Sequence, residues 1–444
     1  MAGEWTLTTL GEIAQLHEEQ VTPASTPDAV FHHFSIPAFD AGRTPVVEIG
    51  SAIGSNKFVV PRDAVLVSKL NPRIPRVWEP DVPTSARAVA STEFLVLRPR
   101  NLVDRRFLRF LCLAPTIRSE MEARVTGTSG SHQRVRPEDA LAIPVEIPVD
   151  LSEQRAIAHI LGTLDDKIEV NRRMSQTLEA MARALFKAWF VDFDPVRAKM
   201  EGRWQRGQSL PGLPAHLYDL FPARLVDSEL GEIPEGWRVV ELEQVIEINP
   251  PRVLRKGQRA PFLDMASMPT RGHVPLRVVE RPYTSGTRFM NGDTLLARIT
   301  PCLENGKTAF VDFLAPNEVG WGSTEFIVLR PKPPLSVEFG YCLARDSDFR
   351  EFAIQSMTGT SGRQRVQPEA LARYLLVVPS DGVAKAFGAL VEPWFRKASA
   401  SERESRTLAA LRDALLPKLI RGEIRVKEME QLVLQHVSNT QKED

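Results

Sequence analysis

The chain contains nearly the same sequence twice, about 230 residues apart. Ser-Thr-Glu-Phe-Leu-Val-Leu-Arg-Pro at 91–99 returns as Ser-Thr-Glu-Phe-Ile-Val-Leu-Arg-Pro at 323–331. Gly-Thr-Ser-Gly at 127–130 returns at 359–362, and Gln-Arg-Val follows shortly after each copy. Because solenoid repeats have periods of about 20 to 50 residues, this spacing indicates a duplicated domain and not an array. Two related but non-identical domains are expected to contact two related but non-identical targets.

Length and composition set bounds on the class of protein. The 444 residues allow two or three domains, and the balance of 56 basic against 56 acidic residues does not by itself point to nucleic acid. The cysteines (112, 302 and 342) are scattered and lack a Cys-x-x-Cys pair, which is typical of a reducing cytosol. No signal-like N-terminus and no run of about 18 apolar residues is present, so we expect a cytoplasmic protein without a membrane span.

Each copy has the pattern of a compact α+β domain. Short apolar runs bounded by turn residues predict strands, and two longer stretches predict helices. The predicted strands are 64–67, 93–97 and 143–147 in the first copy and 293–297, 325–329 and 374–378 in the second, and the predicted helices are 104–113 and 117–124.

Two segments with helical periodicity, about 152–192 and 383–420, follow the copies and align with each other without gaps. Each is about 40 residues, or roughly 60 Å of helix, far longer than the usual globular helix. Their apolar stripes occupy matching positions. The predicted seam consists of Ile157, Leu161, Leu164, Ile168, Leu178, Met181 and Leu185 in the first helix and Phe387, Leu390, Trp394, Leu408, Leu411 and Leu415 in the second.

Both stripes have a polar middle, Asn171 with Ser175 and Ser401 with Ser405, and polar seam residues can fix the register of a helix pair. One alternative is that each helix packs only on its own domain. We favour an antiparallel coiled coil between them. The predicted fold is α+β, with two duplicated α/β domains separated by two long antiparallel helices in a pseudo-two-fold arrangement.

Three motifs resemble catalytic or metal sites but lack an essential part. Asn-Pro-Pro-Arg at 249–252 has Arg where amino methyltransferases need an aromatic ring to stack a flipped base. Gly-Lys-Thr at 306–308 has Pro301 where a phosphate loop needs glycine. His32-His33 has no third ligand. The sequence therefore predicts no catalytic centre and no metal site.

The repeated Gly-Thr-Ser-Gly and Gln-Arg-Val segments combine backbone N–H groups, hydroxyls and a guanidinium, which suit phosphate oxygens. A hairpin turn that the fold requires would recur in both copies too, so the alternatives are phosphate binding and the turn itself. The candidates are Thr128, Ser129, Gln133 and Arg134 in the first copy and Thr360, Ser361, Gln364 and Arg365 in the second.

Basic and amide side chains also occupy Pro-containing loops that follow a predicted strand in each copy. Arg and Lys prefer guanine and Asn prefers adenine in a DNA groove, although an ordinary surface loop is the alternative. If the two halves read different sequences, base readers should lie where the copies diverge. The candidates are Lys69, Asn71, Arg73 and Arg76 in the first copy and Arg271, Arg298, Asn305 and Lys307 in the second.

Over about 1–426 the chain resembles the specificity (S) subunit of type I restriction–modification systems. The resemblance rests on Gln-Arg-Ala-Ile-Ala at 154–158, Trp-Phe-Val-Asp-Phe-Asp-Pro at 189–195, the linker sequences at 217–222 and 228–237, and the close at 416–424. It implies two target recognition domains that alternate with two helical regions. The implied division is 1–151 first target recognition domain, 152–193 first long helix, 194–235 linker, 236–382 second target recognition domain, 383–426 second long helix, and 427–444 polar tail.

The resemblance also implies a role without catalysis. Each recognition domain would read one half of a bipartite double-stranded DNA target, and the helices would dock two methyltransferase (M) subunits and set the gap. The chain would hold no cofactor. The M subunits would use S-adenosylmethionine, and the restriction (R) subunits would use ATP and Mg²⁺. The alternatives are a two-headed protein–protein adaptor and, less favoured, a fused restriction–modification enzyme.

Overall fold

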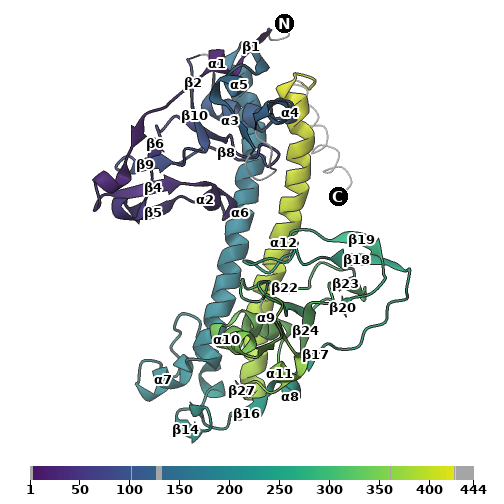
Figure 1. Cartoon of the computed structure of the whole chain (residues 1–444). Helices are drawn as coiled ribbons and strands as arrows, with labels where there is room; N and C mark the ends of the chain where they lie inside the picture. The colour runs from purple at the N-terminus through teal and green to yellow at the C-terminus, as the bar shows by residue number, and fades with distance from the viewer. Residues whose placement is uncertain (1–3, 102, 127–132, 361, 425, 427–444) are drawn as a thin grey trace, which may run out of the picture. The chain divides into compact units, whose positions relative to one another are not determined.

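The computed structural model describes residues 4–101, 103–126, 133–360, 362–424 and 426 (Figure 1). The chain divides into two compact units. Unit 1 comprises 1–168 and 407–444, and unit 2 comprises 169–406. Two 40-residue helices, α6 (Leu151–Phe190) and α12 (Asp381–Ile420), contribute residues to both units. The helices predicted at 152–192 and 383–420 are confirmed.

The α/β domain of unit 1 has two main sheets. One is four-stranded, in the order β2-β10-β7-β8, and the other is five-stranded, in the order β3-β6-β9-β4-β5. The strands are β1 (Trp5–Thr9), β2 (Ala14–Leu16), β3 (Gln20–Val21), β4 (Val30–Phe34), β5 (Val46–Ile49), β6 (Lys57–Val59), β7 (Val65–Ser68), β8 (Val77–Trp78), β9 (Arg87–Ala90), β10 (Phe94–Pro99), β11 (Val125–Thr126), β12 (Arg134–Val135) and β13 (Pro144–Pro148). The helices are α1 (Leu10–Ile13), α2 (Ile36–Asp40), α3 (Arg105–Leu113), α4 (Pro115–Ala123) and α5 (Pro137–Leu141).

Unit 2 repeats this topology, with sheets in the orders β17-β24-β21-β22 and β19-β18-β23-β20. Its strands are β16 (Arg238–Glu241), β17 (Ile246–Ile248), β18 (Arg259–Leu263), β19 (Val279–Pro282), β20 (Thr287–Phe289), β21 (Thr294–Ala297), β22 (Thr308–Phe310), β23 (Gly320–Gly322), β24 (Phe326–Pro331), β25 (Met357–Thr358), β26 (Arg365–Val366) and β27 (Leu375–Val378). Its helices are α8 (Leu242–Val245), α9 (Val337–Arg345), α10 (Ser347–Gln355) and α11 (Pro368–Ala372). The strands predicted in both copies are therefore confirmed to within two residues.

The segment predicted as a linker, 194–235, is folded. It contains α7 (Asp194–Met200), a 3₁₀ turn at Ala215–Leu220, and the hairpin β14 (Leu225–Ser228) and β15 (Gly231–Pro234). Trp204 is buried against Tyr218, with ring centroids 5.0 Å apart, and Trp189 of α6 packs on Phe221 at 4.9 Å. These aromatic contacts join the connection to the core of unit 2, which a proline- and glycine-rich sequence does not reveal.

In unit 2 the two long helices run antiparallel. Asn171 Nδ2 donates to Glu404 Oε2 (2.8 Å), and Ser175 Oγ donates to the carbonyl of Ala398 (3.3 Å), so later residues of α6 face earlier residues of α12. Asn171, Ser175 and Ser401 are all buried. The antiparallel pairing and its polar middle are confirmed.

The predicted seam was wrong at two positions. Met181 is 45% exposed and Leu411 is 46% exposed, so neither lies between the helices. Residues that the apolar pattern excludes, such as Asp165 and Glu179, are buried in their place. The inward stripe therefore includes charged side chains that are paired with other parts of the fold. Of the remaining predicted seam residues, Ile157, Leu161, Leu185, Phe387 and Leu415 are buried, and Leu164, Ile168, Leu178, Leu390, Trp394 and Leu408 are half-buried.

Candidate nucleic-acid interface

Three segments shared by the two copies meet at one point in unit 1. They are the start of β10, the loop after β7, and β12 with the residue before it. Three backbone hydrogen bonds join them: the N–H of Lys69 donates to the carbonyl of Glu93 (3.0 Å), that of Asn71 to Gln133 (2.9 Å), and that of Val135 to Lys69 (3.0 Å). The loop is thus held by backbone groups on both sides. We call this arrangement the three-segment junction.

Unit 2 builds the same junction from the corresponding residues. The N–H of Arg298 donates to the carbonyl of Glu325 (3.0 Å), that of Thr300 to Gln364 (3.0 Å), and that of Val366 to Arg298 (2.9 Å). The two candidate regions that the sequence suggested separately, the repeated turn and the basic loop, are therefore adjacent in each copy.

A half-buried Arg–Glu ion pair closes each junction. Arg134 donates to both carboxylate oxygens of Glu93 at 2.8 to 3.1 Å, and Arg365 does the same to Glu325 at 2.7 to 2.9 Å. Burial alone would raise the pKa of each glutamate. The hydrogen bonds from the arginine have the larger effect and lower it. Because both guanidinium forks bind a carboxylate of their own copy, the geometry favours the turn over phosphate for these arginines.

The other candidate residues of the repeated turns form fewer described contacts. Thr128, Ser129 and Ser361 lie outside the described residues. Gln133 and Gln364 are half-buried and use their backbone carbonyls in the junction, and Thr360 is exposed. Phosphate binding by these side chains stays a prediction.

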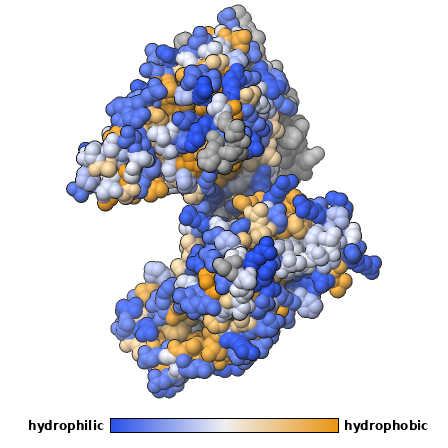
Figure 2. All heavy atoms as spheres, viewed as in Figure 1, coloured by the Kyte–Doolittle hydropathy of each residue, from blue (hydrophilic) through white to orange (hydrophobic). Residues whose placement is uncertain are grey.

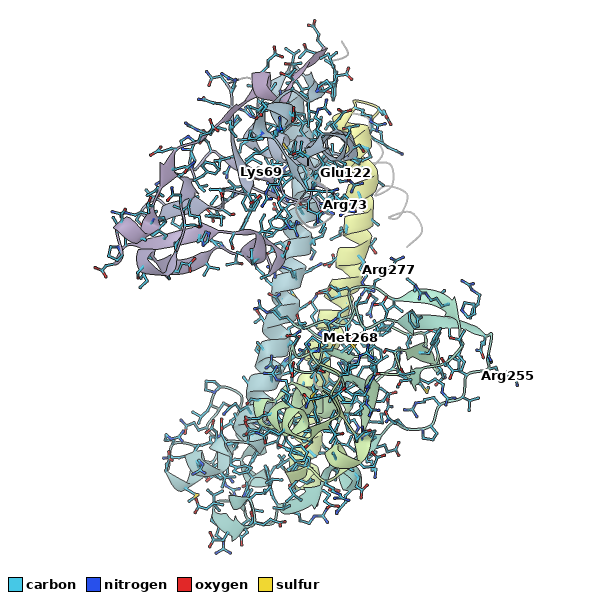
Figure 3. The ribbon with its side chains drawn as sticks, in the orientation of Figure 1. Lys69, Arg73, Glu122, Arg255, Met268 and Arg277 are labelled. Atoms are coloured by element: carbon cyan, nitrogen blue, oxygen red, sulfur yellow. The ribbon has the colours of Figure 1, made fainter. Side chains whose placement is uncertain are left out.

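In unit 1 the base-reading candidates lie within residues 69–76, between β7 and β8, and Figure 3 labels Lys69 and Arg73 of this segment. Asn71 adopts a positive φ of 49° and accepts a hydrogen bond from Arg73 Nε (3.3 Å), and Arg73 is exposed. Arg76 donates to both oxygens of Asp40 (2.7 and 2.8 Å), and its side chain is 10% exposed. Lys69, Asn71 and Arg73 therefore lie at the junction, while Arg76 is already bound to a carboxylate.

In unit 2 the candidates divide in a similar way. Arg298 lies in the junction and donates to Gln367 Oε1 (2.6 Å), and Asn305 and Arg271 are exposed. Lys307 Nζ donates to the carbonyl of Met265 (2.6 Å), which ties the loop after β21 to the segment after β18. Whether any of these residues reads a base stays a prediction.

Sequence reasoning missed Arg345, which fixes those two loops together. Its guanidinium donates to the carbonyls of Thr270 (2.9 Å), Gly306 (2.7 Å) and Thr308 (2.9 Å), and also to Gly272. A buried arginine that binds four carbonyls has no local sequence signature, because its partners lie far along the chain. Glu93 and Glu325 could have been found, since both stand in the repeated Ser-Thr-Glu-Phe.

In each unit, one residue of a short helix, α3 in unit 1 and α9 in unit 2, links the α/β domain to the long helix α6. The two residues occupy equivalent positions. In unit 1, Arg109 of α3 pairs with buried Asp165 of α6, which also accepts from Arg412 Nη1 of α12 (2.5 Å). Burial raises the pKa of Asp165, but the two arginines outweigh it and lower the pKa.

In unit 2 the corresponding residue of α9 is Tyr341, whose hydroxyl donates to Glu179 of α6 (2.8 Å). Glu179 also lies 3.7 Å from buried His273, which lies 3.5 Å from Asp312 on its other side. Burial lowers the pKa of His273, but Asp312 and Glu179 outweigh it and raise the pKa to about 9. The two domains thus use different chemistry at equivalent places.

The motifs that resembled catalytic sites have structural roles. Asn249 has a φ of 52°, and its Oδ1 accepts from the N–H of Val328 (2.9 Å), while Arg252 pairs with buried Asp293 (3.0 Å). In the described part of the chain, no group of three His, Cys, Asp or Glu side chains is arranged to hold a metal ion. Among the same residues, no helix has the length and apolar character needed to cross a bilayer.

Each unit therefore combines a domain of the same topology, part of the two long helices and a loop junction of the same design. Residues 3–180 match the family model of the type I restriction modification DNA specificity domain. The chain is 25% identical to the HindI specificity subunit of Haemophilus influenzae over 376 residues, which cover 76% of this chain and 81% of that protein. It is 34% identical to the EcoAI specificity subunit of Escherichia coli over 145 residues, which cover 30% and 24%.

A solved structure shares the fold. The crystal structure of a type I restriction–modification S subunit from M. genitalium matches with a TM-score of 0.54 and 14% identity, covering 94% of this chain and 96% of that one. The matched domain and the similar proteins support DNA sequence recognition, as in a type I restriction–modification specificity subunit, as the function of this chain.

Proposed function

We propose that the chain reads a bipartite duplex target, with one recognition domain for each half. The observation that supports this most is the duplicated junction. The same backbone hydrogen bonds and the same Arg–Glu pair recur in both units, while the exposed side chains around them differ. A shared framework with different surface residues suits two readers of different sequences, because the framework orients and the variable side chains specify.

The chain acts in this proposal without a catalytic site of its own. Two methyltransferase subunits dock on α6 and α12 and methylate adenine with S-adenosylmethionine, and restriction subunits join them with ATP and Mg²⁺. The complex works on cytoplasmic DNA. The alternative, a protein–protein adaptor with no DNA role, has no support from the family match or from the similar specificity subunits.

The experiment is methylome sequencing of cells that express the chain together with its methyltransferase subunits. We expect a split motif with a methylated adenine in each half and an unspecified gap between them. Removing the chain should abolish the motif while the methyltransferase subunits remain present. A motif that persists without the chain would contradict the proposal.

Replacement of Arg73 by Ala adds a second arm to this experiment. Because Arg73 is exposed at the junction of unit 1, we expect the change to alter one half of the motif and leave the other half as it was. A change in both halves would show that the domains do not read separately. A pure adaptor would show no change in any motif.

A further inference from the structure

We propose that the outer face of the sheet β19-β18-β23-β20 in the second recognition domain binds the phosphodiester backbone of DNA through a pair of stacked arginines, which the matching positions of the first domain lack. This rests on the proposed function, and it adds that the two domains hold DNA with unequal electrostatic strength. The face is defined by Arg281, Phe262, Trp321 and Arg288, one residue from each strand in sheet order.

Strand register puts these side chains on one side of the sheet. Phe262 pairs with Trp321 across β18 and β23, and Arg288 pairs with Trp321 across β20 and β23. Arg281 pairs with Ala260, which lies two residues from Phe262 and so on the same side. The opposite side carries Leu263 and Phe289, which belong to a separate buried core.

Aromatic rings hold the two arginines in place. The Arg281 guanidinium lies over Phe262, 4.6 Å from the ring centroid, and that of Arg288 lies 6.0 Å from the centroid of Tyr283. Phe262 and Tyr283 both pack on Trp321, at 4.4 and 5.3 Å. A guanidinium stacked on a ring keeps its N–H groups available for a phosphate. Trp321 is 5% exposed, so a base cannot stack on it, which favours the backbone of a duplex over single-stranded DNA.

More positive charge surrounds this face. Arg255, Lys256 and Arg277 are exposed on the segments that lead into and out of β18. Figure 3 places Arg255 at the outer margin of unit 2, and Figure 2 shows hydrophilic residues at the outer end of the β18–β19 hairpin. Among the described residues, none of these basic side chains, nor Arg281 or Arg288, forms an ion pair. They therefore keep their charge available for an anionic ligand.

The equivalent face of unit 1 lacks the two arginines of this face at the matching positions. Its strands β5, β4, β9 and β6 have the same order and directions as β19, β18, β23 and β20. By register, Glu48 stands where unit 2 has Arg281, and His33 where it has Phe262. Val89 and Val59 replace Trp321 and Arg288. His33 Nδ1 and Glu48 Oε1 are 2.6 Å apart. Exposed Arg87, which pairs with Phe31, and buried Lys57, two residues before Val59, lie on the same side, so this face carries charges of both signs.

The test measures how salt weakens binding of the full-length chain to a random-sequence DNA duplex. Each phosphate contact contributes about 0.9 to the slope of log K against log salt. The double variant Arg281→Gln with Arg288→Gln should therefore reduce the slope by about two and weaken binding to all sequences alike. Arg281→Lys with Arg288→Lys should keep most of the slope, because the charges remain.

Two matched controls complete the design. Arg203→Gln with Arg206→Gln removes two exposed positive charges from the connecting segment and should leave the slope unchanged. Glu48→Gln alters the equivalent position of unit 1 and should also leave it unchanged. Circular dichroism of every variant confirms the fold.

The outcomes separate this inference from the proposed function. A slope that falls by about two only in the Arg281/Arg288 glutamine variant supports the face as a phosphate site. If the slope is unchanged in that variant, the inference is overturned. It is also overturned if the variant changes the sequence of one half of the methylated motif. Both results leave the proposed function intact. If the unaltered chain binds no duplex, the proposed function itself fails.

Discussion

At the scale of single residues, a glutamate organises the three-segment junction of each unit. Glu93 and Glu325 each accept a bidentate guanidinium and also offer the backbone carbonyl on which the neighbouring loop is hydrogen-bonded. The repeat identified the arginine and the glutamate, but not that they bind each other. Their separation along the sequence, about 40 residues, hides the pair from any local pattern.

We predict that Glu93→Gln and Arg134→Ala have the same effect, because each breaks the pair that holds the turn. Each should lower the free energy of unfolding by about 1 kcal/mol, since the arginine is partly exposed. The double variant should cost little more than either single one. Urea unfolding measures this. If Arg134→Ala alone lowered the salt slope of DNA binding by about one, Arg134 would be a phosphate contact.

The buried histidine predicts a pH dependence. The pKa of His273 is about 9 in the folded chain against 6.5 for the ordinary side chain, so protonation stabilises the fold. That contribution is fully present below pH 6.5 and is lost as pH rises through about 9. The groups facing it are Glu179 and Asp312, with the rings of Tyr341 and Phe395 beside it.

We expect the free energy of unfolding of the second unit to fall by up to about 3 kcal/mol between pH 6.5 and 9.5. His273→Gln should remove most of that slope while it lowers stability at pH 6.5. Urea unfolding at several pH values, followed by tryptophan fluorescence, measures both. An equal slope in the variant would assign the pH dependence to other groups.

At the scale of elements, the long helices show which structural features a sequence pattern can predict and which it cannot. Their lengths, antiparallel order and polar middle followed from periodicity and from the match between the copies. The residues of the inward stripe could not be predicted in the same way, because a search for apolar residues excludes Asp165 and Glu179. Each is buried through partners on a recognition domain and, for Asp165, on α12. Such partners are distant in sequence, so a charged seam residue is predictable only once the domains are placed.

Two neighbouring aspartates of α6, Asp165 and Asp166, allow a buried ion pair to be compared with an exposed one. Asp165→Asn would leave the Arg109 and Arg412 guanidiniums without their carboxylate, and we predict a loss of about 3 kcal/mol. Asp166→Asn breaks an ion pair to Arg106 in which Asp166 is 65% exposed, and we predict less than about 1 kcal/mol. Thermal unfolding compares them. Equal losses would mean that Asp165 does not join α3 to the helix pair.

At the scale of the whole molecule, the duplication was the most informative feature of the sequence. It predicted two domains of one topology and three strands in each of them, because a signal seen twice is stronger than one seen once. It could not predict that the connection at 194–235 is folded, since its aromatic packing involves α6 and is not repeated. Nor could it predict that the two outer sheet faces differ at the positions of Arg281 and Arg288, which depends on strand register.

The central claim is that the two domains read separate half-sites and that the long helices set the distance between them. Because Ser175 faces Ala398, both helices must be lengthened together, and we insert four helical residues after each of these positions. Four residues add about 6 Å, close to one turn, so the flanking faces stay within about 40° of their alignment. Circular dichroism and thermal unfolding confirm that the altered chain folds.

Methylome sequencing of cells that carry the lengthened chain is the most direct measurement. With base pairs spaced by about 3.4 Å, the account predicts that the gap of the methylated motif lengthens by one or two base pairs while both half-sites keep their sequences. Full methylation with an unchanged gap would contradict it, because the helices would then not determine how far apart the two halves are read.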